Sequence, residues 1–96
     1  MVAHKNTHKF KRCDEVVFES LDDNICIFNE KIASYLMLNN TGSFIWKCLE
    51  NPMSLKELYN SAEKSYNFED KTKITKEIDE FIHESINLGI LIEVNS

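Results

Sequence analysis

The sequence predicts an α+β fold, winged helix-turn-helix-like, in which a three-stranded antiparallel sheet is followed by three helices. Two observations lead to this prediction. Short β-branched and aromatic runs separated by turn residues extend to about residue 39, and apolar residues then recur at helical spacing. Two glycines and one proline are few, and 43% of the 96 residues are hydrophobic, which excludes a disordered or loop-rich chain. This length allows one domain with one modest core.

Three short strands are expected first. Residues 16–19 are β-branched, aromatic or charged in a strand-like pattern, and the polar residues that follow Leu21 are typical of a turn. Residues 24–28 form the second expected strand. Asn29-Glu30-Lys31 then turns the chain into a third strand over residues 34–39. Because both turns are short, these strands are expected to form an antiparallel meander.

Three helices are expected after the strands. Asn40 or Thr41 can N-cap a first helix, which ends before Pro52. Ser54 and Glu57 have the spacing of a capping box, in which each residue satisfies a backbone amide of the other, so they begin a second helix.

The third helix is expected to be the longest, from about Asp70 to Leu88, with Gly89 ending it in a left-handed conformation. Residues 90–94 follow as a short β-like tail. The apolar residues of this helix recur at spacings that place them on one face. They are Ile74, Ile78, Phe81, Ile82, Ile86 and Leu88.

Charge is unevenly distributed. Residues 1–12 carry four basic residues and no acidic one, whereas the rest of the chain carries seven basic and 16 acidic residues, a balance of −9. We therefore expect a basic, flexible arm over residues 1–13 and an acidic domain over residues 14–94. The three cysteines lack CxxC spacing, which favours reduced thiols in a cytoplasmic protein and no zinc site. No membrane span is expected, because the longest charge-free window, residues 32–46, is too short.

The third expected strand, residues 34–39, suggests a function. It carries large apolar side chains on both faces, and none of the lysines, prolines or inward charges that usually protect a sheet edge. Such an edge favours the addition of an extended peptide as a further strand. Three alternatives stay open at this point. The C-terminal tail could pair with this edge, the N-terminal arm could cover Tyr35 and Met37, or Met37 could fill the core.

A resemblance to a known family rests on residues 32–46. They hold an aromatic strand, then Leu38-Asn39 and Thr41-Gly42 in the pattern Leu-Asn-x-Thr-Gly, then a helix with Ile45-Trp46. This pattern resembles the PqqD-like family, the RiPP precursor peptide recognition elements. Further similarity covers about residues 14–91 and lies at Leu21-Asp22-Asp23, Leu55-Lys56-Glu57-Leu58, Tyr66 and Gly89-Ile90-Leu91.

Two residues depart from the family pattern. Glu77 stands where an aspartate is usual, and Ser85 stands where a leucine is usual in the apolar stripe of the third helix. A serine there either bonds back to a backbone carbonyl or lines a cavity.

The resemblance implies a small non-catalytic module that binds the leader segment of a ribosomally synthesised precursor peptide. The leader is expected to add to the third strand, against the third helix. The module would then present the peptide to a modifying enzyme such as a radical-SAM maturase or a leader peptidase. No cofactor, metal, nucleic acid or membrane is implied. An uncovered edge strand is also compatible with a homodimer.

The candidate peptide-binding residues come from the third strand and from both flanks of the third helix, because the sequence does not decide which flank faces the strand. Thr75 and Asp79 lie on one flank, and Lys73 and Glu80 on the other, together with Glu77. The full set is Ser34, Tyr35, Leu36, Met37, Leu38, Lys73, Thr75, Lys76, Asp79, Glu80, Ile82 and Ile86.

The alternative is a winged-helix DNA-binding or transcription-regulatory protein. Phosphate contacts require basic residues, yet residues 70–88 hold three lysines, no arginine and five acids, which disfavours this function. Enzyme chemistry is disfavoured too. His4 and His8 have no third metal ligand nearby, and His83 has no cysteine beside it to activate.

Overall fold

A computed structural model gives the structure of this chain, and it describes residues 8–22, 24–29, 34–65 and 71–95. All structural statements below concern these residues. Some features expected from the sequence lie outside them. These features are the turn residues Asp23, Glu30 and Lys31, the motif residues Ile32, Ala33 and Tyr66, the helix start at Asp70, and His4.

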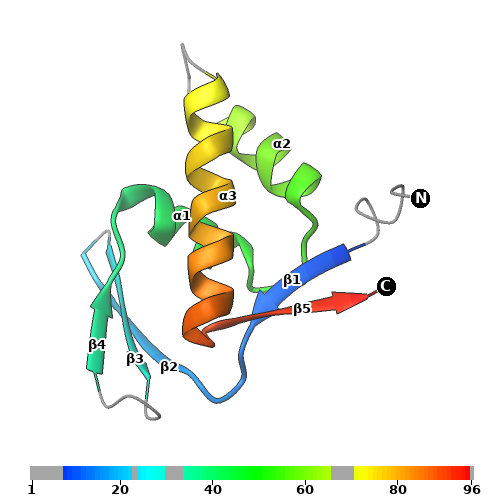
Figure 1. The fold of residues 1–96 in the computed structure, drawn as a ribbon. Coiled ribbons are helices and arrows are strands. Elements are labelled where there is room, and N and C mark those ends of the chain that lie inside the picture. The colour runs from blue at the N-terminus through cyan, green and yellow to red at the C-terminus, as the bar shows by residue number, and fades with distance from the viewer. Residues whose placement is uncertain (1–7, 23, 30–33, 66–70, 96) are drawn as a thin grey trace.

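Three antiparallel strands form one sheet in the order β2-β3-β4 (Figure 1). They are β2 (Val17–Leu21), β3 (Asn24–Asn29) and β4 (Ser34–Met37). The expected meander is therefore confirmed. Its register places Ile27 of β3 opposite Leu36 of β4, and both side chains lie on the face of the sheet that packs on the helices.

A second, two-stranded sheet pairs the two ends of the described chain. The prediction of a flexible arm is therefore wrong for residues 8–12, and so is the prediction of a single three-stranded sheet. β1 (His8–Arg12) runs antiparallel to β5 (Leu91–Asn95). Phe10 holds β1 in this position, because Phe10 is 7% exposed and belongs to the core. Its backbone also exchanges hydrogen bonds of 2.8 and 3.0 Å with Met53. The charges around Phe10 conceal this apolar anchor in the sequence.

Three helices complete the fold: α1 (Asn40–Cys48), α2 (Leu55–Ser65) and α3 (Lys71–Leu88). The α+β class is confirmed, and the winged-helix comparison stays a prediction. Gly89 ends α3 with φ of +80°, the left-handed conformation expected there. No helix in the described part of the chain is long and apolar enough to cross a membrane.

The N-cap of α1 is Asn39, one residue before the expected Asn40 or Thr41. The Asn39 side chain accepts a hydrogen bond of 2.8 Å from the backbone amide of Gly42. Because β4 ends at Met37, Asn39 is still extended, with φ of −75° and ψ of −177°, as an N-cap residue requires.

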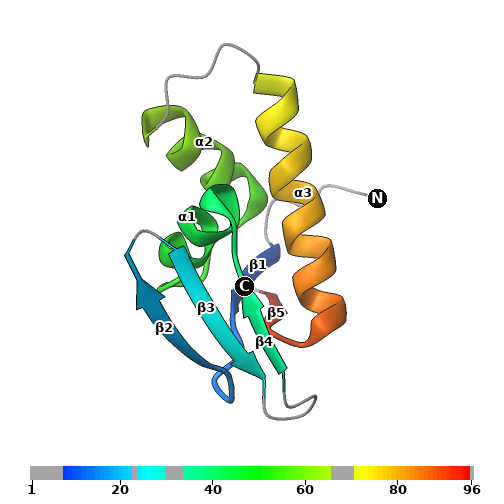
Figure 2. The ribbon, with the colours of Figure 1, turned by 90° about the vertical axis from the view of Figure 1, so that its left-hand side faces the viewer.

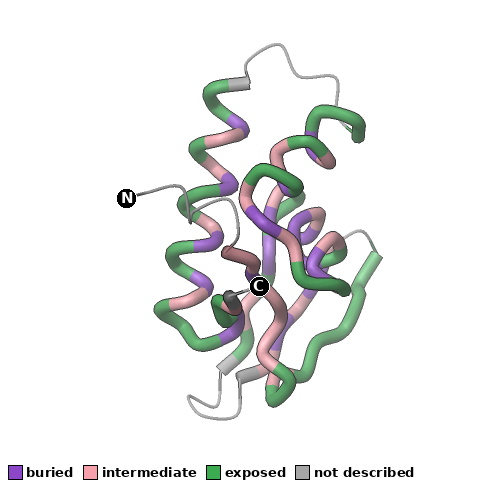
Figure 3. The backbone as a smooth tube through the Cα atoms, turned by 90° about the vertical axis from the view of Figure 1, so that its right-hand side faces the viewer, coloured by how far each residue is buried: buried purple, intermediate pink, exposed green. Residues whose placement is uncertain are grey.

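The apolar face of α3 supplies much of the core. Ile74, Ile78 and Ile82 are buried, and so is Ser85 on the same face. Figure 3 shows these buried positions recurring along the side of α3 that faces the rest of the chain. Trp46 of α1 lies in the same core, with its side chain fully buried.

Arg12 connects the two sheets to α1. Its guanidinium lies 4.8 Å from the centre of the Phe18 ring and 5.1 Å from that of Trp46. Its Nε atom donates a hydrogen bond of 2.9 Å to the backbone carbonyl of Trp46. Burial lowers the pKa of this guanidinium, and the nearby Glu50 carboxylate acts in the opposite direction. β1 therefore contributes a cation that packs on the core.

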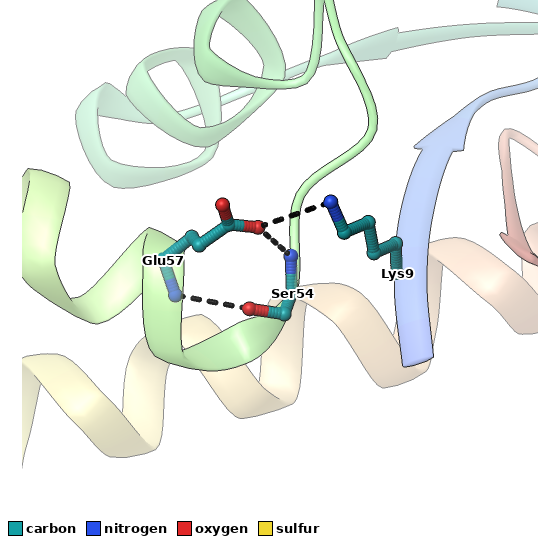
Figure 4. Close-up of polar contacts among 3 residues, drawn as sticks. All are labelled: Lys9, Ser54 and Glu57. Carbon is teal, nitrogen blue, oxygen red and sulfur yellow. Dashed lines mark hydrogen bonds and ion pairs between the residues drawn. The ribbon is translucent and has the colours of Figure 1, made fainter. Parts of the chain in front are cut away.

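The capping box at the start of α2 is confirmed (Figure 4). The backbone amide of Glu57 donates to Ser54 Oγ over 3.2 Å, and the backbone amide of Ser54 donates to Glu57 Oε1 over 2.9 Å. Lys9 Nζ lies 3.9 Å from the same carboxylate. The bond from the Ser54 amide is the main cause that lowers the pKa of Glu57 below 4.5.

Replacing Ser54 with alanine should lower the free energy of unfolding by about 1 kcal/mol near neutral pH. Because the folded-state pKa of Glu57 is lowered, its contribution is present above pH 4.5 and is lost as the pH falls through that lowered value. Urea unfolding at pH 7 and at pH 3 would measure both effects. Because alanine keeps the backbone amide that bonds the Glu57 carboxylate, the pH-dependent contribution is tested with Glu57→Gln, and a cost of Glu57→Gln that is equal at the two pH values would contradict it.

Candidate functional site

β4 is the last strand of its sheet, and its outer edge carries no strand from the described part of the chain. β3 pairs with it on one side only. The C-terminal tail does not cover this edge, because β5 pairs with β1. Tyr35 is 76% exposed and Met37 is 57% exposed, so neither is part of the core, and residues 8–12 of the N-terminal segment pair with β5 and do not cover them. The alternatives of a paired C-terminal tail and of Met37 as a core residue are therefore wrong, and the described part of the N-terminal arm does not cover the strand.

The backbone of β4 presents two residues to the open edge. Leu38 donates its amide to the carbonyl of Ile25 over 2.8 Å, so the polar backbone groups of Leu38 point toward β3. Backbone groups alternate in direction along an antiparallel strand, so those of Leu36, opposite Ile27, point the same way. The N–H and C=O groups of Tyr35 and Met37 therefore point away from β3, where a further strand could pair with them.

The side chains of β4 divide between two faces. Leu38 is buried and Leu36 is half-buried against the core, whereas Tyr35 and Met37 lie on the outer face. The Tyr35 ring packs on Phe28 of β3 with a centroid distance of 5.1 Å. Ser34 begins the strand opposite Asn29.

Ser43 of α1 fixes the end of β4. Its buried hydroxyl accepts a hydrogen bond of 2.9 Å from the backbone amide of Ile25 and donates one of 3.3 Å to the carbonyl of Leu38. The Asn24 side chain donates to the same Leu38 carbonyl over 2.9 Å. These bonds hold β3, the end of β4 and the start of α1 in one rigid arrangement, which sequence analysis did not identify.

A pocket of about 270 Å³ lies where the chain leaves β4 for α1. α3 closes its other side. Figure 2 shows β4 beside β3 in the sheet, with its end continuing into α1. The residues that line the pocket are Asn39, Thr41 and Gly42 from the start of α1, and Glu77, Glu80, Phe81 and Glu84 from α3.

Gly42 allows α1 to lie close against α3 in this pocket. A Cβ atom at position 42 would lie 3.0 Å from Phe81 Cε1 and 3.3 Å from Asn39 Oδ1. The glycine of the Leu-Asn-x-Thr-Gly pattern therefore serves the close approach of the first turn of α1 to the Phe81 ring.

The flank of α3 that carries Glu80 lines the pocket together with the start of α1. The other flank faces α2, because the Tyr59 hydroxyl of α2 donates a hydrogen bond to the Asp79 carboxylate. Burial, reinforced by that carboxylate, raises the pKa of Tyr59. Thr75 and Lys76 lie with Asp79 along a shallow surface depression on that side.

The residues predicted for the site are thus distributed over several regions, including the depression that holds Thr75, Lys76 and Asp79. Ser34 to Leu38 form or follow the open strand, and Glu80 lines the pocket at its end. Ile82 is buried in the core. Sequence analysis did not select Asn39, Thr41, Phe81 or the two glutamates Glu77 and Glu84. The rotation of α3 about its own axis decides which of its residues line the pocket. Only tertiary packing sets that rotation, so the sequence alone could not identify these residues. The remaining predicted residues are Lys73, exposed one turn before Glu77, and Ile86, half-buried.

The three cysteines are free and half-buried, and burial raises the pKa of the Cys48 thiol. In the described ranges, no group of three or more histidine, cysteine, aspartate or glutamate residues could hold a metal ion.

A small α+β domain with an uncovered strand beside a long helix defines a class of domains suited to bind extended peptides. Residues 25–91 match the family described as coenzyme PQQ synthesis protein D, PqqD. This chain therefore belongs to the PqqD family.

Two solved structures are similar to this chain. TbiB1 in complex with the TbiA(beta) leader peptide is 25% identical, with a TM-score of 0.74, and the match covers 84% of this chain and 93% of that one. Lasso peptide synthetase B1 complexed with the leader peptide is 15% identical, with a TM-score of 0.70, and the match covers 86% of this chain and 96% of that one. The second likeness concerns the fold alone. No curated protein matches the chain.

Proposed function

We propose that this chain is a non-catalytic recognition module that binds the leader segment of a ribosomally synthesised precursor peptide. The leader adds as a strand to β4 and lies against α3, and the module presents it to a modifying enzyme, such as a radical-SAM maturase or a leader peptidase. The observation that carries this proposal is the uncovered edge of β4, where Tyr35 and Met37 direct their backbone donors and acceptors outward.

Strand addition suits this edge for a physical reason. Backbone hydrogen bonds supply affinity that does not depend on the peptide sequence, and alternate side chains of the peptide supply selectivity. Residues of the leader opposite Tyr35 and Met37 would point to the outer face, and their neighbours would point toward α3. Membership of the PqqD family supports this proposal, and so does the likeness to TbiB1, which was solved with a leader peptide bound.

We centre the proposed site on β4 and on the flank of α3 that lines the pocket. Ser34 to Leu38 and Glu80 are retained from the sequence prediction, and Phe81 joins them. Lys73, Thr75, Lys76, Asp79, Ile82 and Ile86 stay predictions, although Ile82 is buried and the Asp79 carboxylate already accepts a hydrogen bond from Tyr59.

A fluorescence anisotropy titration tests the proposal. The labelled leader of the precursor encoded beside this gene should bind with sub- to low-micromolar Kd, because ordering a disordered peptide offsets part of the gain from strand pairing. Random duplex DNA in the same assay tests the winged-helix alternative, and no binding near physiological salt is expected. Binding of the duplex without binding of the leader would overturn the proposed function.

A further inference from the structure

We propose that the peptide bound at β4 carries a basic side chain, lysine or arginine, which enters the pocket lined by Glu77, Glu80 and Glu84 and determines which peptides are selected. This inference rests on the proposed function, since it specifies one side chain of the peptide that the β4 edge is proposed to bind. It goes beyond that function because strand pairing alone does not depend on the peptide sequence.

The position of the pocket relative to the strand carries the first step. Asn39 lines the pocket and directly follows Leu38, so the pocket lies at the end of the open edge. A peptide residue opposite Leu38 would point its side chain to the same face as Leu38, the face on which the helices pack. That side chain is the one nearest the pocket. A volume of about 270 Å³ accommodates a single long side chain.

The pocket is acidic. Three carboxylates line it, and none of its lining residues is basic. Lys73 lies one turn before Glu77 but does not line the pocket. Within the described part of the chain, no ion pair engages Glu77, Glu80 or Glu84. Other carboxylates of the domain have partners: Tyr59 donates to Asp79, and the capping box holds Glu57.

The balance of charges in the pocket favours a cationic occupant. The first turn of α1 faces the pocket with the positive end of its dipole, equivalent to roughly half a charge, which falls well short of balancing three carboxylates. A cation would relieve their mutual repulsion. Phe81 adds an aromatic ring, against which the stem of a lysine or the guanidinium of an arginine can pack. A metal ion is the poorer occupant, because these carboxylates do not form a group that could hold one.

Peptide selection tests this inference without knowledge of the natural leader. A phage-displayed library of random 12-residue peptides is selected on the wild-type protein and on the triple variant Glu77→Gln, Glu80→Gln, Glu84→Gln. Wild type should enrich peptides with lysine or arginine at one fixed position. The triple variant should still enrich peptides that require β4, but without that basic residue.

A synthetic peptide from the wild-type selection then gives the affinity. The triple variant should weaken its binding about tenfold. An analogue of the peptide with methionine in place of the basic residue should bind wild type and variant equally. The matched control, Glu15→Gln, Glu19→Gln, Glu50→Gln, removes the same net charge outside the pocket and should change Kd less than about twofold at 150 mM salt.

Each outcome separates this inference from the proposed function. Enriched peptides that bind through β4 but share no basic position would overturn the inference and leave the proposed function standing. Equal weakening by the control variant would also overturn it, because the effect would then come from the overall charge. A failure of wild type to enrich any peptide, together with no binding of the encoded leader, would overturn the proposed function itself.

Discussion

Replacing Met37 with proline is expected to weaken leader binding at least 30-fold while helical circular dichroism stays unchanged. Proline lacks the N–H group that Met37 directs to the open edge, and it is tolerated in edge strands. The lost hydrogen bond and the unpaired carbonyl left on the peptide together cost about 2–3 kcal/mol, which corresponds to roughly 30- to 150-fold in Kd. Fluorescence anisotropy with the labelled leader measures the change.

The chain offers a matched control at the opposite edge of the same sheet. Because Ile25 and Ile27 direct their backbone groups to β4, Cys26 and Phe28 direct theirs to β2, and Ser20 of β2 points its N–H to the other open edge. Ser20→Pro therefore makes the same chemical change where no leader is proposed to bind, and Kd should not change. An unchanged Kd in Met37→Pro would contradict strand addition, and so would an equal loss in both variants.

Replacing Phe10 with alanine should lower the free energy of unfolding by about 3–5 kcal/mol, the usual cost of removing a buried aromatic ring. A domain of this size has a total stability of roughly 5–15 kcal/mol, so this single change removes a large part of it. The expectation follows from the burial of Phe10 and from its backbone pairing with Met53. Urea unfolding followed by circular dichroism gives the value.

Lys11 provides the comparison on the same strand. Its side chain is part-exposed and lies 3.8 Å from the exposed Asp14 carboxylate, an ion pair of small energy. Lys11→Ala should therefore change the stability by less than about 0.5 kcal/mol. If Phe10→Ala costs as little as Lys11→Ala, β1 is a dispensable arm, as the sequence pattern alone had indicated.

Local patterns were sufficient to predict much of this fold. The β-branched and aromatic runs within residues 16–28, separated by turn residues, predicted the first two strands of the meander. The serine and glutamate of the capping box act over one turn of backbone, so the start of α2 could be located without tertiary information. Gly89 is similar, because its left-handed conformation is a local property of the chain.

Contacts between distant parts of the chain were harder to predict. β1 and β5 pair across more than 80 residues, and a single aromatic residue within a basic segment gave too weak a pattern to indicate a strand. The contacts of Ser43 were also hard to predict. Nothing local shows that its hydroxyl bonds to Ile25 and Leu38, yet this serine holds the end of the proposed binding strand in place.

The uncovered third strand could be inferred from residues 34–39 alone, because the absence of protecting charges is a property of the segment itself. Whether anything covers that strand depended on where the C-terminal tail goes, and the tail pairs with β1. The choice between the two flanks of α3 was equally a matter of packing. A helix presents both flanks with similar polarity, and only its rotation against α1 and α2 places Glu80 in the pocket at the start of α1 and Asp79 beside Tyr59.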